Sequence, residues 1–208
     1  MPLQHLYKHA ALNYAHQWFT TDKAFMQQMK SGNPSKINQD TVRSIAANYM
    51  VARGFKKNDA NIWGRVANKL EEFIDSNDQD IEKLATDLGG ISPRQGGANP
   101  PRLISAATKF LWFAGCHEIK IYDKRAVNAL HKLNRLPRTP KTYAAYATAW
   151  SAEYDIHKAE IRRVIAELPD QLEWSGIAQN SYNEAKAVFT ESWFADRVFD
   201  KCLWLHGN

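Results

Sequence analysis

The chain has 208 residues, of which 44% are hydrophobic and 12% aromatic, so it can fill one core without disulfide or metal crosslinks. Cys116 and Cys202 form neither a disulfide framework nor a metal-ligand spacing, no secretory signal is visible, and no apolar run approaches the roughly 18 residues of a membrane span. We therefore expect a soluble protein of a reducing cytoplasm. Lysine and arginine outnumber aspartate and glutamate by 27 to 22, which favours a polyanionic partner.

Apolar side chains recur at helical spacing along nearly the whole chain, and no convincing alternating strand is present. The pattern predicts a second helix that ends at Gly54 in the left-handed conformation, and a fourth that ends at Gly89-Gly90. The sequence therefore predicts an all-α protein. The apolar stripes span residues 3–18, 42–50, 62–74, 81–88, 110–114, 143–150, 161–168 and 182–189, and a further apolar helical surface at 192–205 is expected to dock on the core.

The stretch GGISPRQGGANPPRL, residues 89–103, interrupts this pattern with four glycines and three prolines. These residues cannot continue a helix and predict a turn-rich connector. One interpretation is an ordinary loop between helices. The other is a phosphate-binding surface, because glycine-rich turns leave backbone N–H groups accessible to an anion. In that case Arg94, Gln95 and Arg102 would supply polar contacts.

After the connector, SAATKFLWFAGCHE predicts a buried helix that can end at Gly115, and IKIYD predicts a tight extended connection. Asp123 then falls at the N-cap of KRAVNALHKL, where its carboxylate accepts backbone N–H bonds and meets the positive end of the helix dipole. Capping alone can account for Asp123. The open question is whether the carboxylate also performs chemistry.

The segment from Gly89 to Leu133 resembles the core of the helix-hairpin-helix DNA glycosylase superfamily, including its 8-oxoguanine glycosylase-like members. The resemblance rests on the glycine- and proline-containing turn, the buried helix, the I-Y-D linker and the helix beginning K-R-A-V-N-A-L. It implies a two-lobed domain over 1–208, with a helix-hairpin-helix-like core at 89–138 and a packing lobe formed by 1–88 and 139–208. It also implies double-stranded DNA as the partner, with no cofactor and no metal.

In this family an aspartate at the start of the helix after the hairpin serves the reaction centre, and the matching residue here is Asp123. Such a carboxylate would stabilise positive charge on the sugar as the bond to the base breaks, and would orient or deprotonate the attacking water. Bifunctional members carry a lysine nucleophile just after the hairpin, where this chain has Leu103, Ile104 and Ser105. Lys109 lies a turn further on and is expected to be a solvated helix residue, which favours base removal without strand cleavage.

A glycosylase must also extract its target nucleotide from the duplex and stack it among aromatic side chains. The aromatic or imidazole residues nearest to Asp123 in sequence are Trp112, Tyr122 and His117, which we predict as base contacts, with core packing as the alternative. Lys120, Lys124 and Arg125 flank Asp123 and are predicted phosphate contacts, with a solvated charged surface as the alternative.

Three functional hypotheses remain open at this point. The first is a glycosylase that removes a damaged or modified base, including an antiphage enzyme that acts on hypermodified bases such as glucosylated cytosine. The second is a non-catalytic helical DNA-binding module. The third is a protein–protein module that uses the aromatic C-terminal helices. His5 and His9 have a spacing that can bind a metal, but no partner ligand accompanies them, so they are expected to be surface residues.

Overall fold

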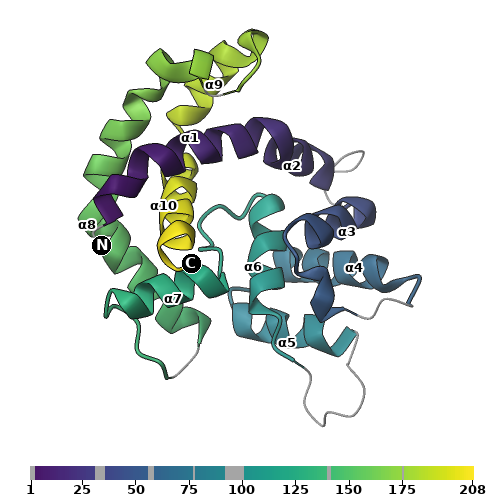
Figure 1. Ribbon diagram of the computed structural model, residues 1–208. Coiled ribbons are helices and arrows are strands. Elements are labelled where there is room, and N and C mark those ends of the chain that lie inside the picture. The colour runs from purple at the N-terminus through teal and green to yellow at the C-terminus, as the bar shows by residue number, and fades with distance from the viewer. Residues whose placement is uncertain are drawn as a thin grey trace. The chain divides into compact units, whose positions relative to one another are not determined.

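The computed structural model describes residues 3–30, 36–55, 59–76, 78–91, 101–139, 142–174 and 176–208. Across these residues every regular element is a helix, which confirms the predicted all-α fold class. The chain forms two compact units (Figure 1). Unit 1 comprises Met1–Asp22 and Asp123–Asn208, and unit 2 comprises Lys23–Tyr122. Unit 2 is therefore inserted between two segments of unit 1, and the division at Tyr122–Asp123 falls inside the predicted core segment 89–138.

Unit 1 is organised around its C-terminal helix, which packs against the other α-helices of the unit that the structure describes (Figure 1). This helix, α10, covers Ser192–His206 and buries Phe194, Val198, Phe199 and Leu203. The predicted docking of the apolar C-terminal segment on a core is thus confirmed. The other elements of unit 1 are η1 (Leu3–Leu6), α1 (Tyr7–Gln17), η2 (Trp18–Asp22), α7 (Lys124–Lys132), α8 (Tyr143–Ala166), η4 (Leu168–Trp174), η5 (Gln179–Ser181) and α9 (Tyr182–Phe189).

Unit 2 is organised around α6 (Ile104–Phe113), in which every residue except Ser105 is buried. A helix that is buried around its whole circumference is a central element, and α6 packs against α2, α3 and α5. The rings of Phe25 and Tyr49 contact Phe113, with centroids 5.8 and 5.4 Å away. The other elements are α2 (Lys23–Met29), α3 (Gln39–Asn48), η3 (Ala52–Gly54), α4 (Ile62–Asp75) and α5 (Ile81–Ile91).

Two predicted helix ends are wrong. Helix α3 ends at Asn48, and the left-handed residue after it is Met50, with φ 54°, rather than Gly54. Helix α5 continues through Gly89 and Gly90 to Ile91. Gly89 serves a close approach instead of a turn, because a Cβ there would lie 1.8 Å from the carbonyl oxygen of Pro101.

The predictions around Asp123 agree with the structure. Gly115 follows α6 with φ +100°, a conformation that favours glycine, and the segment from Ile119 to Asp123 is neither helix nor strand. Helix α7 then begins at Lys124. Residues 92–100 lie outside the described part of the chain, so the helix-hairpin-helix element itself stays a prediction. Within the described part, no helix is both long and apolar enough to cross a bilayer.

Candidate functional site

Asp123 is a structural N-cap, as predicted. Its backbone is extended, with φ −131° and ψ 142°, and its Oδ1 accepts the N–H of Arg125 at 2.9 Å. The side chain is half-buried. The cap holds the carboxylate in a fixed position at the N-terminus of α7. It therefore meets one requirement of a group that stabilises a developing cation.

The first turn of α7 faces the last turns of α10 through an exposed aromatic ring. The Arg125 guanidinium carbon lies 4.0 Å from the ring centroid of Trp204, and the Lys201 ammonium nitrogen lies 5.2 Å from the same centroid. Trp204 is 36% exposed, one of three large hydrophobic side chains so exposed in the described part of the chain. Arg125, Lys201 and Trp204 are called the α7–α10 cluster below.

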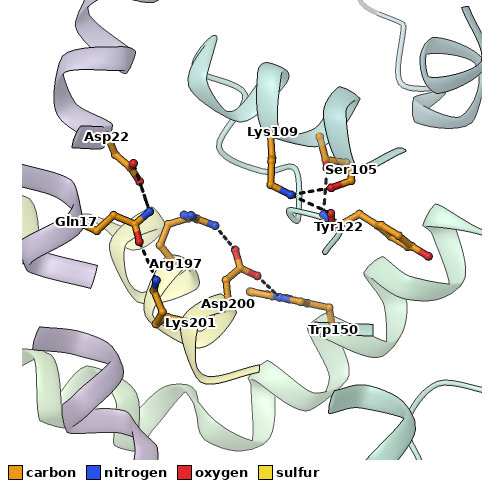
Figure 2. A network of polar contacts seen from close by, with 10 residues as sticks. Gln17, Asp22, Ser105, Lys109, Tyr122, Trp150, Arg197, Asp200 and Lys201 are labelled. Carbon is orange, nitrogen blue, oxygen red and sulfur yellow. Dashed lines mark hydrogen bonds and ion pairs between the residues drawn. The ribbon is translucent and has the colours of Figure 1, made fainter. Parts of the chain in front are cut away.

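Lys201 is held by a partly buried chain of polar side chains, Gln17 and Asp22 (Figure 2). Its ammonium donates to Oε1 of Gln17 at 2.8 Å, and the Gln17 amide donates to Oδ2 of Asp22 at 3.2 Å. Asp22 is completely buried. Burial lowers the pKa of Lys201, nearby Arg197 lowers it further, and the carboxylates of Asp22, Asp123 and Asp200 act in the opposite direction. The Asp123 carboxylate therefore raises the pKa of Lys201, another residue of unit 1.

A second buried set on α10 positions the same helix (Figure 2). Arg197, only 7% exposed, donates to Oδ2 of Asp200 at 2.8 Å, and the Trp150 indole N–H donates to Oδ1 of Asp200 at 2.7 Å. Burial raises the pKa of Asp200, while Arg197 and Trp150 favour its charged form. The Arg197 guanidinium also lies 5.2 Å from the ring of Tyr14. These contacts fix the rotation of α10 and with it the direction of Lys201 and Trp204.

Within unit 2, the expectation for Lys109 is wrong, because this side chain is 3% exposed and not solvated. Its ammonium donates to Ser105 Oγ at 2.7 Å and to the carbonyl oxygen of Tyr122 at 3.5 Å (Figure 2). Thr108, also on α6, accepts the N–H of Tyr122 at 3.1 Å. A single turn of α6 therefore holds the backbone of the residue that immediately precedes Asp123 in the chain.

The three predicted base contacts all belong to unit 2. Trp112 is 1% exposed and packs edge-on against Phe113, with ring centroids 5.1 Å apart. The His117 ring lies 5.1 Å from the Trp112 ring at an interplanar angle of 35°. Tyr122 is half-buried, and burial raises its pKa. Trp112 thus has the packing of a core residue, whereas Tyr122 and His117 keep partly exposed side chains, and the base-pocket role of all three stays a prediction.

The predicted phosphate contacts are not gathered in one place. Arg102 makes an ion pair with Glu82 at 2.7 Å in unit 2, and Lys120 is half-buried in the same unit. Lys124 is exposed and Arg125 half-buried on α7 of unit 1. Arg94 and Gln95 lie outside the described residues. Among the described members of this group, Arg125 is the one that contacts Trp204 of the α7–α10 cluster.

Sequence reasoning missed Lys201 and Trp204. They lie about 80 residues from Asp123, and periodicity predicts their segment only as an apolar surface. The available signal was their i, i+3 spacing, which places a cation and a tryptophan on one helix face.

Two hollows of about 540 and 590 Å³ in unit 1 are lined by residues other than those of the α7–α10 cluster. No cluster of three or more metal-ligating side chains occurs among the described residues.

No protein-family model, curated protein or solved structure matches this chain.

Proposed function

We propose that the chain is a DNA glycosylase that excises a damaged or modified base by hydrolysis, with Asp123 as the carboxylate at the reaction centre. The observation that carries the proposal is the setting of Asp123 in unit 1. Its carboxylate is fixed by the α7 cap, in which it accepts the N–H of Arg125, and the cations of Arg125 and Lys201 lie 4.0 and 5.2 Å from the ring of the partly exposed Trp204. The likeness of residues 89–133 to helix-hairpin-helix glycosylases supports the same conclusion.

The reaction needs few groups. As the bond from C1′ to the base nitrogen breaks, its electron pair leaves with the base and positive charge develops on the sugar. A carboxylate held in place stabilises that charge without reorganising. Asp123 also accepts a proton from the attacking water, whose oxygen bonds to C1′, and the proton finally passes to the departing base. One water is consumed, and an abasic site and a free base are formed.

Among the candidate substrates, we propose a hypermodified base such as glucosylated cytosine. Removal of such a base would serve defence against phages in the cytoplasm. We propose monofunctional excision, so that the DNA strand stays intact after base removal. The test therefore includes borohydride trapping. A covalent protein–DNA adduct would show that an amine attacks in place of water, and would contradict monofunctional excision.

The test incubates the purified full chain with duplexes that carry unmodified, oxidised, alkylated or glucosylated bases and measures abasic sites by alkaline cleavage. Asp123→Asn is the decisive variant, because asparagine caps a helix as well as aspartate but carries no charge. We expect its rate to fall by about 10²- to 10⁴-fold. Asp80→Asn is the matched control, since Asp80 accepts the Lys83 N–H at 3.0 Å at the start of α5. It removes an N-cap carboxylate of unit 2 and should leave the rate unchanged.

Two results would remove the enzymatic proposal. One is the absence of abasic sites on every duplex, and the other is equal activity of the wild type and Asp123→Asn. DNA binding without product, unaffected by Asp123→Asn, would instead identify the non-catalytic DNA-binding module.

A further inference from the structure

The α7–α10 cluster differs from other charged surfaces of unit 1 in how its cations are used. Arg135 binds Glu153 at 2.5 Å, and Arg163 contacts Glu160 at 2.6 Å. In the described part of the chain neither Arg125 nor Lys201 makes an ion pair. Arg125 stacks on Trp204, and Lys201 donates to the neutral amide of Gln17. Their positive charge is therefore available to an external anion.

Trp204 adds a second property to the same place. A tryptophan ring with cations at 4.0 and 5.2 Å gains from cation–π attraction, which fixes its rotamer, yet 36% of the side chain stays exposed to solvent. Proteins that bind a nucleic-acid strand combine cations for the phosphates with aromatic rings on which bases stack. A protein ligand of acidic character would need the cations but not the ring.

We infer that Trp204, Lys201 and Arg125 form a contact surface for a nucleotide that flanks the excised one, with its base against the exposed part of Trp204 and its phosphate at the two cations. The inference rests on the proposed function for the identity of the strand as DNA. It adds two residues, Lys201 and Trp204, that the likeness of residues 89–133 cannot reach, because both lie on α10.

The placement follows from the geometry of one helix turn. Asp123 caps α7 through the N–H of Arg125, so the carboxylate and the guanidinium belong to the same turn. Arg125 in turn lies on Trp204. A strand whose sugar reaches Asp123 therefore passes the cluster within one nucleotide or so. The cluster should consequently affect substrate binding, and hence KM, more than the chemical step.

The test measures binding of a fluorescent DNA strand by anisotropy, with the full chain carrying Asp123→Asn so that no turnover occurs. In this background Trp204→Ala should weaken binding by about 5- to 150-fold, the range found for loss of one base–aromatic stack. Trp204→Phe should restore most of the affinity, since it keeps a ring. Ile156→Ala removes another exposed hydrophobic side chain of unit 1, 59% exposed, and should have no effect.

The salt dependence of DNA binding distinguishes the contribution of the Trp204 ring from that of the two cations. Arg125→Gln and Lys201→Gln should each reduce the slope of log K against log salt by about 0.7 to 0.9, because each removes one phosphate contact. Trp204→Ala should weaken binding and leave the slope unchanged. Lys158→Gln is the matched charge control, because Lys158 is exposed on α8 and paired with Asp155 at 2.7 Å. It should alter neither quantity.

The inference and the proposed function fail in different ways. Binding of Trp204→Ala and both charge variants at wild-type strength overturns the inference, even if abasic sites form. If Trp204→Ala weakens the binding of heparin as much as the binding of DNA, the inference is also overturned, because heparin offers no bases to stack. Loss of DNA binding in these variants upholds the surface even where no abasic site is produced, and then the proposed function alone fails. Thermal unfolding of each variant checks that its fold is intact.

Discussion

Two adjacent glycines at the end of α5 give the sharpest test of the fold, because the same substitution should have opposite effects at the two positions. Gly89 is buried, and a Cβ there would lie 1.8 Å from the carbonyl oxygen and 2.9 Å from the carbonyl carbon of Pro101. Gly90 is exposed, and a Cβ there would meet no atom within 4 Å. Both residues are helical, so backbone strain does not distinguish them.

The cost at Gly89 can be worked out from these distances. A Cβ must stay at least 3.0 Å from backbone atoms, so Gly89→Ala forces α5 and the chain at Pro101 to separate by about 1.2 Å. That movement also stretches the 2.9 Å hydrogen bond from the Leu103 N–H to the Ala85 carbonyl. Overpacking costs about 1–3 kcal/mol and a lost hydrogen bond about 1 kcal/mol, so the free energy of unfolding should fall by roughly 2–4 kcal/mol.

Gly90→Ala should instead stabilise the protein by about 0.5–1 kcal/mol, because alanine loses less conformational entropy than glycine in a helix. Urea unfolding followed by circular dichroism measures both changes, and each kcal/mol corresponds to about 2–4 °C in Tm. If residues 89–90 instead formed a left-handed turn, alanine would be strained at both positions and both variants would be destabilised. That result, or a neutral Gly89→Ala, would refute the helical assignment and the close approach of Pro101.

Three further predictions concern unit 1. Asp123→Ala removes the α7 cap and should lower the free energy of unfolding by about 0.5–2 kcal/mol, whereas Asp123→Asn should change it by less than about 0.5 kcal/mol; urea titrations of the two variants compare these values. Lys201→Met should leave stability at pH 7 unchanged or higher, because burial disfavours the charged amine, and a clear loss in the same assay would contradict this. Burial raises the pKa of Tyr7 to about 12, so the unfolded chain ionises first and stability should fall as pH rises from 10 to 12; the absence of any fall in a pH series of unfolding curves would contradict this.

The sequence was sufficient for the features that depend on local chemistry. Helical periodicity predicted the all-α class, and an aspartate before K-R-A-V-N-A-L predicted the N-cap of α7. The end at Gly115 followed from a glycine after an apolar run. Each of these features is decided by residues within about one helix turn, where spacing and backbone preference outweigh contacts with distant parts of the chain.

The wrong or missed predictions concern residues whose positions are decided by packing against parts of the chain that are distant in sequence. Lysine is costly to bury, which favours a surface position for Lys109, but α6 is buried on all sides and leaves no solvated face for it. The local sequence around Gly89 favours a turn. It does not show that the backbone of Pro101 approaches this glycine closely in the folded chain. Lys201 and Trp204 reach the first turn of α7 through the packing of α10, which periodicity alone cannot pair with a particular partner helix.

The position of Lys201 shows why a half-buried cation would be retained at some cost. The chain leaves unit 1 at Asp22 and returns at Asp123, and both carboxylates act on Lys201, the first also through the amide of Gln17. The folded-state pKa of Lys201 is lowered, so the unfolded chain holds this proton more tightly and the charged amine opposes folding at neutral pH. An apolar residue on α10 would avoid that cost but would leave Trp204 with Arg125 as the remaining cation of the α7–α10 cluster. A destabilising charge at a precise position is the pattern expected of a residue kept for binding, since stability alone would favour its loss.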